Sequence, residues 1–236
     1  MAIIMQARNI TKTFRVGGRE FKALNNVSFA IEEGSLNVIL GPSGAGKSTL
    51  LNILGGMDTP TYGSLEVEGQ EIAGTSNAGL SKYRRDKVGF VFQFYNLMPN
   101  LTALENIELA TELKRDAKNP REALASVGLS ERENNFPSQL SGGEQQRVSI
   151  ARAVAKNPTI LLCDEPTGAL DYETGKEILA LLAKMAREEG RTVIIVTHNS
   201  ALSRFGDRLI KLKNGEIVLN RAVPNPKAIE DISWSP

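Results

Sequence analysis

The sequence predicts an α/β protein with a parallel β-sheet at its core, an N-terminal antiparallel β-subdomain and an inserted helical subdomain. Four short, almost wholly apolar runs, "SLNVIL", "KVGFVF", "TILLC" and "TVIIV", are typical of strands that are covered on both faces. The N-terminal region instead alternates apolar and polar side chains, as half-buried strands do. Between Thr102 and Ala155 the sequence has helix start and stop signals and no comparable strand pattern.

The antiparallel region begins with "IIMQARNITKTFR" and "KALNNVSFAIEEGS", which "VGGRE" joins as a turn. The segment "GSLEVEGQEI" alternates in the same way further along the chain. Between these pieces the buried strand "SLNVIL" runs into the glycine-rich stretch "GPSGAGKST" and then the helix "STLLNIL". We therefore expect a strand, a tight loop and a helix in direct succession.

Three helices are expected in the insert, which we place at about residues 95–157. The segment "TALENIELATELKR" starts with Thr102 and Glu105 at capping-box spacing. The segment "PREALASVG" has proline at its start and glycine at its end, and "EQQRVSIARAVAKNP" ends before Pro158. We expect these helices to form a subdomain within one domain that covers residues 1–220.

After the insert, "TGKEILALLAKMAREEG" predicts an amphipathic helix that ends at Gly190. Its apolar face is expected to carry Ile178, Leu181, Leu182 and Met185. The segment "RLIKLKNGEIVLN" predicts a hairpin with an Asn-Gly turn. The tail, residues 221–236, contains prolines and the only tryptophan, Trp234, and we expect it to lie on the surface or to be loose.

Composition describes an ordinary globular protein, with 41% hydrophobic and 23% charged residues among 236. The net charge of +1 gives no overall field that would attract nucleic acid, so we expect no nucleic-acid partner. The single cysteine, Cys163, excludes an internal disulfide and suits a reducing compartment such as the cytosol. The apolar runs are too short for a signal peptide or a bilayer span, so a link to a membrane would require a partner.

The stretch "GPSGAGKST" fits a phosphate-binding loop between a strand and a helix. Its glycines let successive backbone N–H groups and the helix N-terminus point at the β-phosphate of a nucleotide. Lys47 is expected to bridge the β- and γ-phosphates, and the Ser48 hydroxyl to ligate Mg²⁺. The nucleotide-binding residues predicted here are Gly41, Pro42, Ser43, Gly44, Ala45, Gly46, Lys47, Ser48 and Thr49.

Two acidic residues, Asp164 and Glu165, follow the apolar strand "TILLC". Ligand sites of parallel sheets form at the carboxyl ends of the strands, so this pair is expected beside the phosphate loop. Asp164 is then positioned to hold Mg²⁺ and Glu165 to act as general base on the attacking water. A solvated loop after a strand is the alternative.

Gln93 and the only histidine, His198, each follow the end of another apolar strand. At that edge His198 is expected to hydrogen-bond the γ-phosphate, and Gln93 to contact Mg²⁺ or the attacking water. A packed or surface role is the alternative for each residue.

The stretch "LSGGE" is a second glycine-containing helix start. Ser141 and Glu144 have the spacing of a capping box, which alone predicts a well-capped helix. Gly142 and Gly143 have poor helix propensity and favour a close approach to the backbone, which a phosphate would fit. This stretch follows a loop in the helical insert and not a sheet strand, so it does not lie at the edge that holds the other motifs.

Together these residues resemble the ATP-binding cassette (ABC) ATPases, in the order Walker A, Q-loop, signature, Walker B, D-loop and switch histidine. The resemblance covers residues 1 to about 220. It implies ATP and Mg²⁺ as cofactors and a homodimer in which Ser141, Gly142, Gly143 and Glu144 of one subunit close over ATP held by the other. It further implies that Asp171 of "GALD" lies at the dimer interface. Phe14 stands where the family places a tyrosine that stacks on adenine, and Glu144 stands where the commonest signature has glutamine.

Within the family, "RRDKVGFVFQFYNLMPNLTALENIELA" and "DEPTGALD" resemble the macrolide-efflux, lipoprotein-release and cell-division cassettes. That resemblance implies an exporter or mechanotransmission complex at the cytoplasmic face of the cell membrane. The partner would be a permease with few membrane spans and a large extracytoplasmic domain. It also predicts that the loop "FYNLMP", through Tyr95 and Leu97, contacts this partner, although the loop could instead pack on the insert. A soluble ABC ATPase acting on the ribosome or DNA is the alternative function, and a small-molecule kinase would leave "LSGGE" and "GALD" unexplained.

Overall fold

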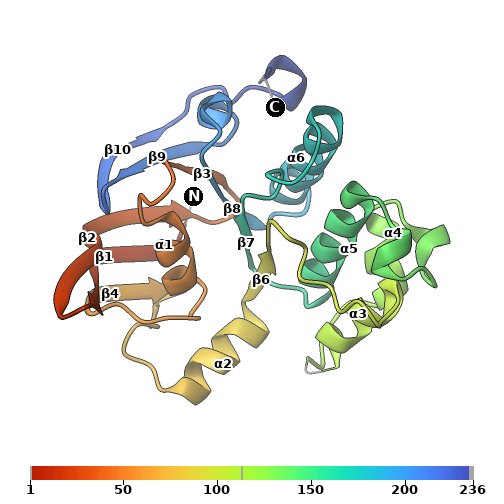
Figure 1. Cartoon of the computed structure of the whole chain (residues 1–236), viewed down its shortest axis with the longest axis horizontal. Helices are drawn as coiled ribbons and strands as arrows, with labels where there is room; N and C mark the ends of the chain where they lie inside the picture. The colour runs from red at the N-terminus through yellow and green to blue at the C-terminus, as the bar shows by residue number, and fades with distance from the viewer. Residues whose placement is uncertain (1, 113, 234–236) are drawn as a thin grey trace.

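The computed structural model describes residues 2–112 and 114–233 of the chain and has two β-sheets. The larger sheet has six strands in the order β10-β9-β3-β8-β7-β6 (Figure 1). Every neighbouring pair in it is parallel except β9 with β10, which form the hairpin predicted around the Asn-Gly turn. Its strands are β3 (Leu36–Leu40), β6 (Val88–Val91), β7 (Ile160–Asp164), β8 (Thr192–Thr197), β9 (Arg208–Lys213) and β10 (Glu216–Ala222).

Alternate side chains of the central strands enter two separate hydrophobic cores. Val38 and Ile195 belong to the core that also contains α5 (Gly142–Ala155) and α6 (Tyr172–Arg187). Ile39 and Val196 point the other way, toward α1 (Lys47–Leu54) and the antiparallel sheet. The apolar runs are therefore continuous because both faces of this sheet are covered, as predicted.

The smaller sheet is antiparallel, with strand order β2-β1-β4-β5. It consists of β1 (Ile3–Val16), β2 (Arg19–Glu32), β4 (Tyr62–Val67) and β5 (Gln70–Glu71), which confirms the predicted N-terminal antiparallel region. The helix α2 (Asn77–Asp86), which the sequence patterns do not identify, connects this sheet to β6. Only Leu80 and Tyr83 of α2 are buried, so its apolar stripe is too narrow to stand out in the sequence.

The insert contains α3 (Ala103–Thr111), α4 (Pro120–Ser126) and α5, which lie to one side of the larger sheet (Figure 1). The capping box of Thr102 and Glu105 is confirmed at the start of α3. The expected length of α3 is wrong, because the helix ends at Thr111 and not near Arg115. Among the described residues, no helix is long and apolar enough to cross a membrane.

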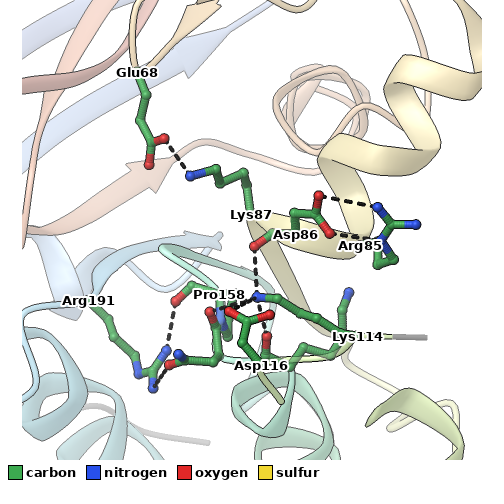
Figure 2. A network of polar contacts seen from close by, with 10 residues as sticks. Glu68, Arg85, Asp86, Lys87, Lys114, Asp116, Pro158 and Arg191 are labelled. Atoms are coloured by element: carbon green, nitrogen blue, oxygen red, sulfur yellow. Dashed lines mark hydrogen bonds and ion pairs between the residues drawn. The ribbon is translucent and has the colours of Figure 1, made fainter. Parts of the chain in front are cut away.

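Lys114, just beyond α3, fastens the insert to the core. Its buried ammonium donates to the backbone carbonyls of Asp86 (3.0 Å), Lys156 (2.6 Å) and Asn157 (3.1 Å) (Figure 2). These carbonyls lie at the ends of α2 and α5, where intrahelical partners are missing. The lysine thus satisfies acceptors from two helices at once.

The helix α6 has a slightly different buried face from the one expected. Ile178, Leu182 and Met185 are buried as predicted, but Leu181 is only partly buried and Leu179 is fully buried in its place.

The tail lies on the surface of the domain, which is one of the two arrangements expected, and it is packed there as far as it is described, so the alternative of a loose segment does not hold for these residues. Val223, Ile229 and Ile232 are buried against the core that contains α6. The hydroxyl of Tyr172, in the first turn of α6, donates to the carbonyl of Ile232 at 3.2 Å. Trp234 lies outside the described residues.

Candidate nucleotide site

The predicted phosphate loop connects the end of β3 to the start of α1. Gly46 has φ +98°, and a Cβ there would lie 2.4 Å from the carbonyl oxygen of Ala23, so only glycine fits. Within the described part of the chain, no side chain caps α1, so its first N–H groups remain available to an anion. The ammonium of Lys47 is buried and donates to the carbonyls of Gly41 (2.9 Å) and Pro42 (3.1 Å), which holds it against the loop.

Asp164 ends β7 and lies beside the first turn of α1. The Ser48 hydroxyl is hydrogen-bonded to its carboxylate. Burial raises the pKa of Asp164 above its ordinary value, and the bond from Ser48 lowers it only in part. A partly desolvated carboxylate beside a hydroxyl is a donor set that suits a hard divalent cation.

Glu165, the next residue, occupies a left-handed conformation with φ +46°. Its backbone N–H donates to the carbonyl of Val196 at 2.9 Å, which ties the turn to β8. Its side-chain Oε1 lies 2.8 Å from Nδ1 of His198 and 3.8 Å from Nζ of Lys47. Such backbone strain in a non-glycine residue is characteristic of functional sites, where it aims a side chain that neighbouring groups hold.

These residues share one open cavity of about 870 Å³. Phe14 on β1 and Phe21 on β2 are directly opposite each other across the strand pair and are both exposed in it. Phe21 is missed by sequence reasoning, although its position opposite Phe14 across a two-glycine turn was a usable signal. The predicted residues in its lining are Phe14, Pro42, Ser43, Gly44, Gly46, Lys47, Ser48, Thr49, Gln93, Asp164, Glu165 and His198.

Gln93 enters the cavity from the end of β6 and packs against the turn that follows Glu165. A Cβ at Gly168 would lie 2.9 Å from Nε2 of Gln93, so the glutamine contacts the start of the "GALD" segment. Asp171, at the end of that segment, accepts a hydrogen bond from the N–H of Thr174 at 3.1 Å and caps α6. The two loops are therefore in contact beside the cavity.

The second glycine-containing helix start is a capping box, as predicted. The N–H of Ser141 donates to the Glu144 carboxylate at 2.8 Å, and the N–H of Glu144 donates to the Ser141 hydroxyl at 3.2 Å. Arg132 holds the same carboxylate at 3.0 Å. The backbone N–H of Ser141 and this guanidinium keep the pKa of Glu144 below its ordinary value.

The two glycines of this helix start are both approached closely by side chains of the same chain. A Cβ at Gly142 would lie 2.8 Å from the hydroxyl oxygen of Tyr95, and one at Gly143 would lie 2.3 Å from the methyl group of Thr174. Packing within the chain therefore gives one reason for glycine at these positions, whereas the sequence argument offers a phosphate as the reason.

Seven of the predicted site residues are not among the described residues that line the cavity. Gly41 and Ala45 are buried behind the loop, where a Cβ at Gly41 would lie 2.4 Å from a carbonyl of β9. The other five belong to the insert and to the start of α6: Ser141, Gly142, Gly143, Glu144 and Asp171. This separation agrees with the sequence argument that "LSGGE" does not lie at the sheet edge.

In the loop after Gln93, the side chains that are exposed to solvent are not the two that were predicted to contact a partner. Tyr95 is half-buried with its hydroxyl at Gly142, and Leu97 packs against the core that contains α5. Phe94 and Met98 are 73% and 49% exposed. For Tyr95 and Leu97, the packing alternative therefore holds.

A strand, a phosphate loop and a helix, with two carboxylates at the end of β7 in the same sheet, define a nucleotide-binding ATPase. The family model described as ABC transporter matches residues 24–168, and the chain belongs to this family. An ABC transporter ATP-binding protein of Methanocaldococcus jannaschii, MJ0796, is 49% identical over 91% of this chain and 95% of its own. A Thermotoga maritima ABC transporter ATP-binding protein is 47% identical over 92% of this chain and 94% of its own.

Solved structures agree with this assignment. The dimeric structure of the cassette MJ0796 in a post-hydrolysis state with ADP and Pi has a TM-score of 0.86 and 45% identity, and covers 94% of this chain and all of that one. The structure of cbiO1 of Clostridium perfringens, which is part of the ABC transporter complex cbiONQ, has a TM-score of 0.81 and 28% identity over 94% of this chain and 89% of its own. The chain is therefore an ATP-binding and ATP-hydrolysing subunit of an ABC transporter, with the predicted α/β fold.

Proposed function

We propose that the residues of this cavity hydrolyse ATP with Glu165 as general base. A carboxylate oxygen that already contacts a histidine and lies near the phosphate-loop lysine is placed to accept a proton from water beside the γ-phosphate. Lys47 binds the β- and γ-phosphates, and His198 orients Glu165 and reaches the γ-phosphate. Phe14 and Phe21 offer a face on which the adenine ring stacks.

Mg²⁺ fits the same residues. Ser48 and Asp164 are already in contact, and Gln93 lines the same cavity, so three residues with oxygen donors are available there. When bound with ATP, the cation would neutralise the charge that develops on the phosphates. The Ser48 hydroxyl would then ligate the cation directly, and Asp164 and Gln93 would bind it directly or through water.

The subunit acts as a homodimer in this proposal, with "LSGGE" of one copy over the nucleotide of the other. The observation that carries it is the separation within one chain: the cavity and the signature are both formed, and they do not meet. The capped helix start can serve a phosphate only from outside its own subunit. The dimeric MJ0796 structures support this arrangement by analogy.

A membrane permease receives the motion of this dimer. Export is favoured by the subgroup resemblance and by a relative from Pseudomonas fluorescens named as a probable export ATP-binding/permease protein. The two sequences are 44% identical over 94% of this chain, and the matched region is 35% of the longer protein. The permease would have few spans and a large extracytoplasmic domain, which places the subunit at the cytoplasmic face of the membrane. Its docking surface includes Phe94 and Met98, the exposed side chains of the loop after Gln93.

A mixed dimer tests whether the site is shared. One subunit carries Lys47→Ala and the other Ser141→Arg, and both carry Glu165→Gln to prevent hydrolysis. If the signature acts across the dimer, both lesions fall in one site and the other is intact, so one ATP is retained per dimer. If each signature serves its own subunit, both sites are damaged and none is retained.

The two variant subunits carry different affinity tags, and purification on both tags in turn recovers only mixed dimers. The retained ATP is counted after rapid gel filtration. The Glu165→Gln homodimer must retain two ATP molecules, and each homodimer that carries a second lesion must retain none. With those controls satisfied, zero ATP on the mixed dimer contradicts the shared site.

A further inference from the structure

The loop that follows Gln93 contains two consecutive residues in the left-handed conformation. Tyr95 has φ +59° and Asn96 has φ +49°. Neither is glycine, so each costs free energy that the surroundings must offset. The loop begins in the nucleotide cavity at Gln93 and ends at the N-cap of α3, so its shape links the two places.

Side chains of the insert hold this loop at both ends. From α5, Arg152 donates from Nη1 to the carbonyl of Asn96 at 2.5 Å and from Nη2 to the carbonyl of Tyr95 at 2.9 Å. From α3, the buried Asn106 accepts from the N–H of Met98 at 2.7 Å and donates to the Met98 carbonyl at 3.1 Å. The fork of the guanidinium matches the two carbonyls of the strained pair, one nitrogen to each.

The same loop also contacts the start of α5. The hydroxyl of Tyr95 lies against Gly142, in the first turn of α5, while Arg152 occupies the last turn of the same helix. Burial lowers the pKa of Arg152, but both of its bonds are to carbonyls, which keep the charged donor partnered. The loop is thus bound at two points to one rigid helix.

We propose that Arg152 is a positioning residue that locks the strained loop after Gln93 to the signature helix, so that the loop and Ser141–Glu144 move together. This inference rests on the proposed dimer, in which the signature must meet the partner's nucleotide. A shift of Gln93 on nucleotide binding is then passed through Tyr95 and Asn96 to both ends of α5. Arg152 makes no contact with the cavity itself in the part of the chain that the structure describes.

The test uses Arg152→Lys in the full-length Glu165→Gln protein. Lysine keeps the charge but presents one compact ammonium, which cannot serve both carbonyls as the fork does. The matched control is Arg121→Lys, because Arg121 also lies in the insert and forms an exposed ion pair with Glu133.

The first readout is hydrogen exchange of the peptide 93–98 in the nucleotide-free monomer. Arg152→Lys should raise its exchange rate by about tenfold, because the two carbonyl bonds that hold the left-handed pair are lost. Unchanged exchange would overturn the clamp, and this readout does not depend on dimer formation.

The second readout is the MgATP concentration at which half of the protein is dimeric by gel filtration, compared with the Kd of MgATP for the monomer. Arg152→Lys should raise the former by about tenfold and leave the latter within about twofold. If the dimerisation midpoint and the Kd of MgATP rise equally and the melting temperature falls, Arg152 has a general structural role and the proposal is overturned. An unchanged dimerisation midpoint would also overturn it. If the Glu165→Gln parent itself does not dimerise, the proposed function fails, and the exchange result still decides the clamp.

Discussion

The carboxylate of Glu165 and the imidazole of His198 are in direct contact, with Oε1 and Nδ1 2.8 Å apart. The histidine side chain is largely exposed at 66%, whereas that of Glu165 is 14% exposed, so the contact connects a partly buried carboxylate to the open side of the cavity. Lys47 approaches the same oxygen from the phosphate loop. The three groups converge where the γ-phosphate and its water are expected.

Replacing Glu165 with glutamine should abolish steady-state hydrolysis while MgATP is still bound. The amide cannot accept the proton from water, an effect of about 10² to 10⁴ in rate, whereas Lys47, Ser48 and Asp164 are untouched. Phosphate release and ATP binding are measured on the same preparation. Residual turnover within about tenfold of the unaltered protein would show that another group activates the water.

Asp164→Asn should stabilise the nucleotide-free protein and weaken Mg²⁺-dependent ATP binding. Because burial raises the pKa of Asp164 in the folded state, the folded protein loses stability as pH rises from the ordinary value of 3.8 through the raised one. The asparagine variant does not lose this stability, so its advantage in unfolding free energy should grow as the pH rises through 3.8 and level off above the raised pKa.

Thermal unfolding at about pH 3.5 and about pH 7, without Mg²⁺, measures this advantage because the two values lie on either side of the start of the window. Asp58→Asn is the comparison. The Asp58 carboxylate forms an ion pair with Lys12 at 2.6 Å, so this substitution should lower the stability of the protein. An advantage of Asp164→Asn that shrinks as pH rises would contradict the assigned cause.

Phe94→Asp combined with Met98→Asp should prevent the permease from copurifying with the subunit and leave ATP binding intact. Both side chains are exposed, so charge at these positions costs little in the subunit alone but is buried in the proposed interface. Tyr95→Asp would test folding instead, because the tyrosine packs on Gly142. Val218→Asp, also at a 60% exposed position, is the control. An intact complex would exclude this loop from the interface.

Ile229→Ala and Ile232→Ala should each lower the free energy of unfolding by about 2 kcal/mol, the lower end for a buried isoleucine, since the tail lies at the edge of the core. Both side chains are at most 5% exposed. Chemical denaturation measures the loss, and Val218→Ala should have no comparable effect. Equal stability of all three variants would show that the tail adds nothing to the fold.

Periodicity and motif spacing were enough to predict the buried sheet, the antiparallel region and the cavity residues from Lys47 to His198. These features depend on local patterns: a strand buried on both faces is apolar throughout, and its carboxyl end adjoins that of its neighbour. The position of Phe21 depends on strand pairing, and the inward turn of Tyr95 depends on a contact with a helix far along the chain. Such contacts between distant segments leave no periodic trace in the sequence. The role of Arg152 was invisible for the same reason.

The glycines of "LSGGE" allow a final test, because packing and phosphate binding make different demands on them. Gly143→Ala should destabilise the protein by about 1–3 kcal/mol, since the new Cβ would lie 2.3 Å from the methyl group of Thr174. Thr174→Ser removes that methyl group, so the double variant should regain its stability.

ATP-dependent dimerisation of the double variant, measured in the Glu165→Gln background, then distinguishes the two demands. The Cβ at Gly143 points toward α6 of its own chain, so the relieved variant should dimerise at nearly the ATP concentration that the parent requires. Ser141→Arg should remain defective in dimerisation, because the arginine adds bulk at the exposed helix start, while the lost N-cap lowers the free energy of unfolding by only about 0.5–2 kcal/mol. A stable double variant that does not dimerise would mean that the partner's nucleotide approaches Gly143 directly, and packing alone would not explain the glycine.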